Sequence, residues 1–396
     1  MSEVGRRGFL TGTMAAAGGI ALGAVAGDAA RTRETFHGAH QAGILSAPRP
    51  AAALLSFDLA TRDRGELAAL LKTLTGRARF LTAGGTAPNP GIASPPDDSG
   101  ILGPTVRGGD LAVTVSLGSS AFDGRFGLAA RKPAQLRAMD EFPNDDLDRS
   151  QCDGDLLVQI AADEPDTVVH AIRDVTRHSA GLLVPRWRID GTSPPPRPSG
   201  GPRNYLGFKD GTANPDAGDH ALMDQLVWVT GAAEPAWAAG GSYQVVRVIR
   251  MLTEFWDRVS ISEQERMIGR RRDSGAPFTG RVEHDIPDYT NDPGGDATPL
   301  DAHIRLANPR TKATDGQRIL RRSFNYDRGI DRNGSLDMGL VFTSYQRDLD
   351  RQFVTIQKRL AHEPLVDYIS PVGGGYFFAL PGLHDDRDWY GRALLS

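Results

Sequence analysis

Two short segments of the chain contain residue types that could do chemistry. His303 stands in the segment Asp-Ala-His-Ile-Arg-Leu-Ala-Asn-Pro-Arg, where the Asn-Pro pair should end any helix or strand. Arg321 follows eighteen residues later, after the apolar pair Ile319-Leu320. Most of the nine histidines should be ordinary packed or solvated side chains. His303 is distinguished by these surroundings, and it is the candidate metal ligand.

The second segment, residues 207–215, reads Gly-Phe-Lys-Asp-Gly-Thr-Ala-Asn-Pro. Asp210-Gly211 is a turn dipeptide that hairpins and calcium loops both use, although the complete EF-hand pattern is absent. Glycines on both sides of Asp210 would let a flat ligand approach the backbone closely. The segment therefore predicts a plain turn, a calcium loop or the wall of a flat-ligand site. A third segment, residues 373–382, predicts a glycine-rich turn into a terminal strand.

The composition limits how a cofactor could be held. Cys152 is the single cysteine, which excludes an internal disulfide, the Cys-x-x-Cys-His attachment of c-type haem and an all-cysteine metal site. The formal net charge of -4 gives no electrostatic reason to expect nucleic-acid binding. We interpret the basic run Arg270-Arg271-Arg272 as a solvated helix end.

The first thirty residues predict an export signal. Arg6-Arg7-Gly8-Phe9-Leu10 precedes a weakly apolar, Ala/Gly-rich stretch, and Ala24-Val25-Ala26 supplies the small residues that a signal peptidase needs. The paired arginines indicate the twin-arginine variant, which exports folded proteins and so favours a bound prosthetic group. No other apolar run reaches the roughly 18 residues of a membrane helix. We therefore expect a twin-arginine signal peptide over residues 1–26 and a periplasmic or extracellular protein.

The elements that must position the candidate residues follow from hydrophobic periodicity. Residues 193–202, Ser-Pro-Pro-Pro-Arg-Pro-Ser-Gly-Gly-Pro, fit neither a helix nor a central strand and mark a junction between domains. Before this junction we expect strands at 51–59, 111–117 and 155–162, a helix at 64–74, and a second helix with Val168, Ile172 and Val175 on one face.

The same pattern recurs after the junction. Residues 338–344 predict an apolar strand and residues 348–360 a helix, in the order of the strand and helix that begin at residue 155. This recurrence indicates a weak internal duplication and an α+β fold of two domains, each a sheet covered by helices on one side. We assign residues 27–195 to the first domain and residues 203–396 to the second.

Five segments in order carry a resemblance to a known family: residues 36–44, 207–215, 303–310 with Arg321, 339–342 and 373–382. Together they resemble the dye-decolorising (DyP-type) haem peroxidases, and most of all the twin-arginine-exported deferrochelatase/peroxidase branch. The resemblance implies two ferredoxin-like domains, with one non-covalent haem b in the second.

The resemblance also implies roles for individual residues. His303 would be the proximal iron ligand, with Asp367 as the carboxylate that makes its imidazole electron-rich. Asp210 would transfer a proton between the oxygens of hydrogen peroxide, and Arg321 would stabilise the charge on the leaving oxygen. The spacing from His303 favours Arg321 over the adjacent Arg322.

Further positions match residues that contact haem in the family. Leu340 and Phe342, two apart on a strand, would form an apolar distal wall. Ser323 departs from the Gly or Asn that some relatives place two residues after the distal arginine. The remaining expected haem contacts are Gly211, Thr212, Ala213, Asn308, Pro309 and Arg310, the last as a propionate partner.

The implied activity is oxidation of phenolic, aromatic or dye-like donors by hydrogen peroxide in one-electron steps. The alternative is a deferrochelatase or iron-uptake protein that acts on haem or Fe(II), and a third hypothesis is a calcium-binding module built on Asp210. The expected partners are peroxide, an aromatic donor and the twin-arginine translocase, without nucleic acid or a transmembrane segment. A homo-oligomer is compatible with the sequence.

Overall fold

A computed structural model describes residues 34–396, so the predicted signal peptide lies outside the described residues. In the first half, four strands form an antiparallel array in the order β2-β3-β1-β4, which is the order of a ferredoxin-like unit. Helices α1 and α2 connect β1 to β2 and β3 to β4. The elements are β1 (Ala51–Leu59), α1 (Arg64–Ala83), β2 (Leu111–Gly118), β3 (Leu156–Ala162), α2 (Pro165–His178) and β4 (Leu183–Thr192).

The second half repeats this order as β9-β5-β8-β7, again antiparallel. The short strand β6 pairs with β8 beyond the end of β7. The strands are β5 (Ser242–Met251), β6 (Leu320–Arg321), β7 (Phe324–Ile330), β8 (Leu336–Gln346) and β9 (Ile369–Ala379). The helices are α3 (His220–Leu226), α4 (Thr253–Trp256), α5 (Ile261–Ile268), α6 (His303–Ala307), α7 (Thr355–Leu360) and α8 (Arg392–Leu395).

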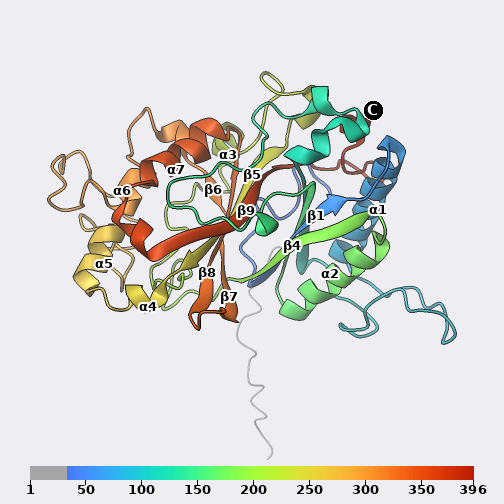
Figure 1. Ribbon diagram of the computed structural model, residues 1–396, viewed down its shortest axis with the longest axis horizontal. Helices are drawn as coiled ribbons and strands as arrows, with labels where there is room; N and C mark the ends of the chain where they lie inside the picture. The colour runs from blue at the N-terminus through green and yellow to red at the C-terminus, as the bar shows by residue number, and fades with distance from the viewer. Residues whose placement is uncertain (1–33) are drawn as a thin grey trace, which may run out of the picture. The chain divides into compact units, whose positions relative to one another are not determined.

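The two sheets join at both edges. Strand β2 pairs with β9 over three residues, and Thr192 at the end of β4 pairs with Asn325 of β7. Eight strands therefore close into a ring, which leaves few unpaired edges. Figure 1 shows α1 and α2 beside the first-half strands and α4 to α7 beside the second-half strands. The predicted α+β fold of two ferredoxin-like units is confirmed by this topology and by the structural neighbours reported below. The predicted domain boundaries stay a prediction.

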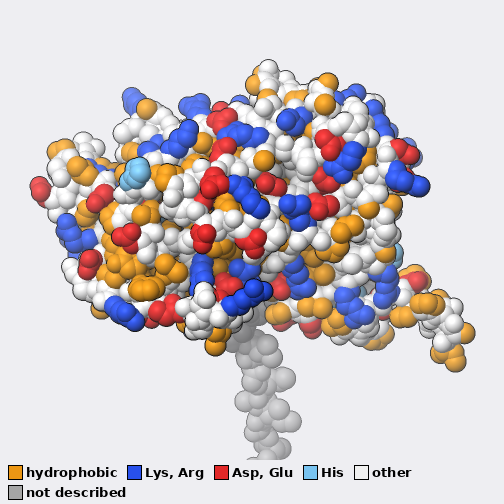
Figure 2. Space-filling view, viewed as in Figure 1, with side chains coloured by type: hydrophobic (Ala, Val, Ile, Leu, Met, Phe, Trp, Pro, Cys, Tyr) orange, Lys and Arg blue, Asp and Glu red, His pale blue; other side chains and the backbone are white. Residues whose placement is uncertain are grey.

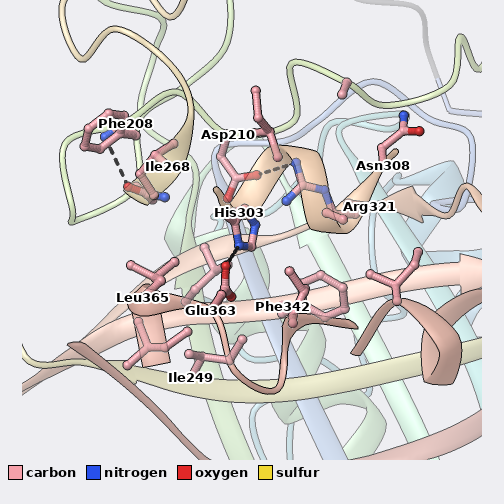
Figure 3. A pocket seen from close by; sticks show the side chains of 18 of the residues that line it. Phe208, Asp210, Ile249, Ile268, His303, Asn308, Arg321, Phe342, Glu363 and Leu365 are labelled. Carbon is pink, nitrogen blue, oxygen red and sulfur yellow. Dashed lines mark hydrogen bonds and ion pairs between the residues drawn. The ribbon is translucent and has the colours of Figure 1, made fainter. Parts of the chain in front are cut away.

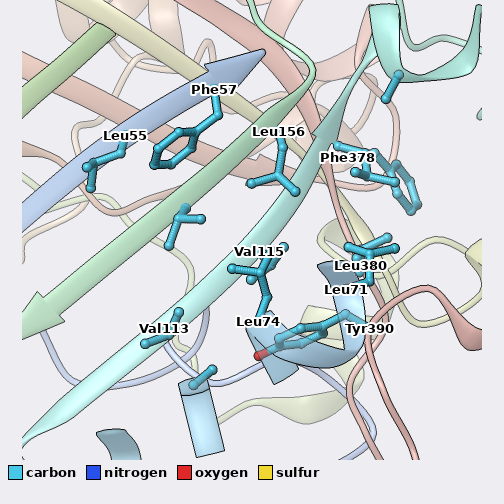
Figure 4. Packing of buried hydrophobic residues seen from close by; sticks show 14 of the residues in the cluster. Leu55, Phe57, Leu71, Leu74, Val113, Val115, Leu156, Phe378, Leu380 and Tyr390 are labelled. Atoms are coloured by element: carbon cyan, nitrogen blue, oxygen red, sulfur yellow. The ribbon is translucent and has the colours of Figure 1, made fainter. Parts of the chain in front are cut away.

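Strand alternation separates an inner core from an outer one. Ala52 and Leu54 of β1 face the interior of the ring, whereas Ala53 and Leu55 face the helices. In the outer core, Leu71 and Leu74 of α1 pack with side chains of the first-half strands (Figure 4). Each leucine buried in this way contributes roughly 1.5–3 kcal/mol. The first half thus fills its helix-covered face with apolar side chains.

A buried ion pair ties the two halves together. Arg247 of β5 is 1% exposed, and it pairs with Asp145, whose side chain is fully buried, in the segment between β2 and β3. Asp145 also accepts a hydrogen bond from the backbone N–H of Phe142 (2.9 Å). Removing one partner of such a pair leaves an uncompensated buried charge, which makes this contact hard to lose.

Two local predictions need correction. Residues 373–375 are not a turn: they lie within β9, where an added Cβ on Gly374 (φ +122°) would meet the Val246 carbonyl oxygen at 2.0 Å. Glycine is required there because two strands approach closely. The predicted helix at 348–360 begins as a π-helical turn, Asp350–Val354, before α7.

On the face seen in Figure 2, cationic and anionic side chains are interspersed, which keeps the potential over that face low. Across residues 34–396, no helix combines the length and the apolar character that a membrane crossing requires.

Candidate functional site

The site is built around His303, the first residue of α6. This helix is only five residues long because Asn308-Pro309 ends it, as the sequence predicts. His303 Nδ1 lies 2.7 Å from Oε2 of Glu363, which is 3% exposed. Figure 3 shows Glu363 on one side of the imidazole and Asp210 with Arg321 on the other. With Nδ1 committed to the carboxylate, Nε2 is the nitrogen left to ligate a metal.

The carboxylate on His303 is Glu363, and the predicted partner Asp367 is wrong. Glu363 stands just before the 3₁₀ turn Pro364–Tyr368, where it is buried against His303. Asp367 lies at the far end of that turn and is exposed. The turn therefore directs only the first of the two carboxylates towards α6. A sequence signal existed, since glutamate has the longer reach and Glu363 lies four residues upstream.

The Glu363 contact sets the electrostatics of the imidazole. Burial by itself would lower the pKa of His303, but the Glu363 charge and hydrogen bond outweigh it and raise that pKa above its ordinary value. A carboxylate in this position makes the imidazole a more basic, more electron-rich ligand.

Asp210 and Arg321 form an ion pair that faces the same cavity. Arg321 Nη2 lies 3.0 Å from Asp210 Oδ1, and both side chains are largely buried. Arg321 belongs to β6, and Asp210 to the loop that follows the interdomain junction. Arg322 instead donates from Nε to the carbonyl of Ile44 at 2.9 Å. The structure therefore places Arg321 in the site and Arg322 outside it, as the spacing from His303 favours.

Asn214 fixes the Asp210 loop to β6. Its Oδ1 accepts from the backbone N–H of Arg321 (3.1 Å), and its Nδ2 donates to the Arg321 carbonyl (2.9 Å). This two-point contact sets the distance between loop and strand, and so between the two charged side chains. Asn214 lies within the segment 207–215, but no feature of the sequence indicates this role for it.

These residues line a cavity of about 240 Å³. All of its lining residues except Asn144 come from the second half of the chain. Ser323 is not among them, although its buried Oγ has no hydrogen-bond partner within residues 34–396. Of the expected site residues, Gly211, Pro309 and Asp367 also lie outside the lining. The expected residues that do line it are Asp210, Thr212, Ala213, His303, Asn308, Arg310, Arg321, Leu340 and Phe342.

The lining of the cavity suits a group that is both apolar and anionic. Leu340 and Phe342 belong to its apolar wall, together with Phe208, Ile249 and Leu365. The cations Lys209, Arg247, Arg270, Arg310, Arg318 and Arg321 line it against the two acids Asp210 and Glu363.

Arg310 lines the cavity with a buried nitrogen, Nε, that has no hydrogen-bond partner in the described chain. Its backbone is left-handed (φ 57°). A guanidinium with an unused donor beside an apolar cavity suits a carboxylate. With the imidazole nitrogen of His303, these residues fit haem, which has an iron, an apolar ring and two propionates.

The basic run after α5 also contributes, contrary to its interpretation as a solvated helix end. Arg270 is buried and lines the cavity, while Arg271 is exposed. The calcium hypothesis finds no support in the side chains. Within residues 34–396, no three His, Cys, Asp or Glu side chains come together in a cluster that could bind a metal ion.

Comparison with known proteins gives consistent matches over nearly the whole chain. The family models described as "Dyp-type peroxidase, N-terminal" and "Dyp-type peroxidase, C-terminal" match residues 41–193 and 201–384. A protein of Escherichia coli K12 named Deferrochelatase is 49% identical over 381 residues, covering 95% of this chain and 90% of the relative. A Shigella flexneri protein of the same name is 47% identical over 412 residues, covering 100% and 98%.

Solved structures agree with these matches. The DyP-type peroxidase of Cellulomonas bogoriensis is 36% identical with a TM-score of 0.80, covering 91% of this chain and 98% of that one. Ferric DtpA of Streptomyces lividans is 35% identical with a TM-score of 0.81, covering 91% and 96%.

The buried His303–Glu363 contact leads to a test with a matched control. Glu363→Gln keeps the side-chain volume but removes the charge, so we expect haem affinity to fall about 10- to 100-fold. The measurement is the rate of haem transfer to excess apomyoglobin. Asp367→Asn changes an exposed carboxylate and should leave that rate unchanged. The reverse ranking of the two variants would reinstate Asp367 as the partner.

Proposed function

Because this chain belongs to the Dyp-type peroxidase family, we propose that Asp210 and Arg321 are the residues that activate hydrogen peroxide beside His303. The family predicted from the sequence is confirmed, and with it the peroxidase class and the haem cofactor. The observation that carries the proposal is the Asp210–Arg321 pair, 3.0 Å apart, on the cavity that His303 also lines.

Each residue has a defined task in this proposal. His303 holds the haem iron, Arg310 binds a propionate with Asn308 beside it, and haem when bound supplies the iron at which the O–O bond is broken. Asp210 accepts a proton from one peroxide oxygen and returns it to the other, so that water leaves. Arg321 stabilises the negative charge on the departing oxygen.

The surrounding residues prepare the cavity for this reaction. Leu340 and Phe342 keep water away from the reacting oxygens, which strengthens the electrostatic effect of Arg321. Gly211, Thr212, Ala213 and Pro309 are further expected haem contacts. Two one-electron oxidations of phenolic, aromatic or dye-like donors complete the cycle.

Substituting the proton-transfer residue tests the proposal. Asp210→Ala should lower the second-order rate with hydrogen peroxide about 10²- to 10⁴-fold, the usual contribution of a positioned acid–base group. Stopped-flow absorbance at the Soret band measures this rate. Asp216→Ala, an exposed aspartate of the same loop, should leave it unchanged. An unaltered rate in Asp210→Ala would remove Asp210 from the mechanism.

A second candidate function is iron release from haem. It is favoured by the relatives named Deferrochelatase, which at 47–49% identity resemble this chain more than the peroxidase structures do at 35–36%. In this function haem, or Fe(II), is the substrate.

Product analysis separates this function from peroxidase activity alone. Incubation of the protein with excess haem should yield Fe(II) or Fe(III) captured by a chelator, together with intact protoporphyrin identified by mass spectrometry. His303→Ala, which lacks the proposed ligand, should release about as little iron as protein-free haem. Recovery of only unchanged or oxidatively opened porphyrin from the wild type would rule the function out.

Export is proposed from residues 1–26 alone. The arginine pair would engage the twin-arginine translocase after folding and haem insertion, and deliver the protein to the periplasm or beyond. Assembly into a homo-oligomer stays a prediction.

A change of the arginine pair tests export. Replacing Arg6 and Arg7 together by lysine should hold the protein in the cytoplasm, as measured by fractionation and immunoblotting. The same change at Arg31 and Arg33, beyond the predicted cleavage site, should leave export intact. Equal export of both variants would contradict a twin-arginine signal.

A further inference from the structure

Glu283 lies outside every motif that the sequence singles out, yet it is among the best-connected carboxylates near the cavity. It belongs to the connection between α5 and α6 and is 7% exposed. Its carboxylate accepts from Lys209 Nζ at 2.6 Å, from Thr212 Oγ1 at 3.0 Å and from the backbone N–H of Gly201 at 3.0 Å. All three donors are distant in sequence, at separations of 74, 71 and 82 residues.

Two of the three donors flank Asp210 in the chain, and the third lies beside the residue to which the Asp210 backbone is bonded. Lys209 precedes it by one residue and Thr212 follows it by two. Gly201 adjoins Pro202, whose carbonyl accepts the backbone N–H of Asp210 at 2.8 Å. The Glu283 carboxylate therefore holds both the loop that carries Asp210 and the strand of backbone to which that loop is bonded.

The backbone at Gly200 packs tightly against the Glu283 carboxylate. A Cβ on Gly200 would meet Glu283 Oε2 at 1.8 Å, and Gly200 also has a positive φ of 80°. The Lys209 side chain is 5% exposed, so its charge is buried together with that of Glu283. Breaking a buried pair of this kind is costly, because it leaves an uncompensated buried charge.

Glu283 is itself fixed from the cavity side. Arg270 Nη1 donates to the Glu283 carbonyl at 2.8 Å and to the Gly275 carbonyl at 2.7 Å, and Arg270 lines the cavity. Burial would raise the pKa of Glu283, but its bonds to Lys209, Gly201 and Thr212 lower it, so the group is a carboxylate at neutral pH. The backbone of Glu283 is thus held by Arg270, and its carboxylate is held by Lys209, Thr212 and Gly201.

We propose that Glu283 is a positioning residue for the peroxide reaction: through Lys209 and Thr212 it holds Asp210 where proton transfer requires it, without touching peroxide or haem. The inference rests on the proposed role of Asp210. Glu283 and Asn214 would then together hold the Asp210–Arg321 pair, because Asn214 fixes the other end of the same loop to Arg321. Misplacement of a reacting group by about 1 Å can cost about 100-fold in rate.

A double-mutant cycle with haem-loaded protein tests this role. Glu283→Gln, Asp210→Ala and the double variant are compared with the wild type in the second-order rate with hydrogen peroxide. Glu283→Gln should lower the rate at least about tenfold when Asp210 is present and less than about twofold when it is absent. The same fold-loss in both backgrounds, or no loss in either, would overturn the proposal, since a merely structural residue would not depend on Asp210.

Two further variants keep the test decisive. Asp155→Asn changes a buried carboxylate of the first half that also accepts a backbone N–H and pairs with an arginine, and it should leave the peroxide rate within twofold. If Glu283→Gln does not fold, Glu283→Asp replaces it in the cycle. This variant keeps the charge but shortens the side chain by one methylene, so it should weaken the bonds to Lys209 and Thr212 and slow the reaction at least about threefold, again only when Asp210 is present.

Amide hydrogen exchange separates this proposal from the proposed function. In Glu283→Gln, exchange across residues 207–215 should rise at least about tenfold, while exchange in β1 should not change. If Asp210→Ala reacts with peroxide as fast as the wild type, the proposed function fails, whereas faster exchange would still establish that Glu283 holds the loop. Unchanged exchange in that segment would refute the positioning role by itself.

Discussion

The hydrogen bond between His303 and Glu363 is the contact on which the rest of the site depends. It joins α6 to the turn that leads into β9, and so connects the helical connection after β5 with the ring of strands. It also fixes which imidazole nitrogen faces the cavity and raises the basicity of that nitrogen. The cavity, its apolar wall and the Asp210–Arg321 pair are then arranged around an imidazole that has one orientation.

The acidic and basic groups opposite His303 are held by a different principle. Neither Asp210 nor Arg321 is placed by a helix; one lies on a loop and the other on a two-residue strand. Their positions are instead set by side chains that bond to backbone, Asn214 on the Arg321 peptide and Glu283 on the segment around Gly201. A loop constrained at several points can approach the precision of a regular element, because each bond removes one of its alternatives.

The sequence predicted those features that depend on neighbours in the chain. β1 was expected at its observed bounds because residues 51–59 are mostly apolar and strand-like, and Asn308-Pro309 ends α6 as expected. What failed depended on distant contacts. Arg270 was interpreted as part of a solvated helix end, because the sequence does not show that a later loop supplies the carbonyl groups that it binds. The partners of the Glu283 carboxylate lie more than 70 residues away in the chain. Glu363 and Asp367 lie at opposite ends of one 3₁₀ turn, and only the fold determines which of these ends faces α6.

The repeated topology explains where the cavity is. In the first half, α1 crosses the outer face of the sheet and fills it with Leu67, Leu70, Leu71 and Leu74. The equivalent connection in the second half, between β5 and β7, has no long helix but the short helices α4, α5 and α6 with extended segments between them. The outer face of β5 and β8 is therefore only partly filled by protein side chains, and Ile249, Leu340 and Phe342 on that face line the cavity. The second half lacks the packing of a 20-residue helix such as α1, so it buries less apolar surface there. Haem, held by His303 and Arg310 as we propose, would restore much of this burial.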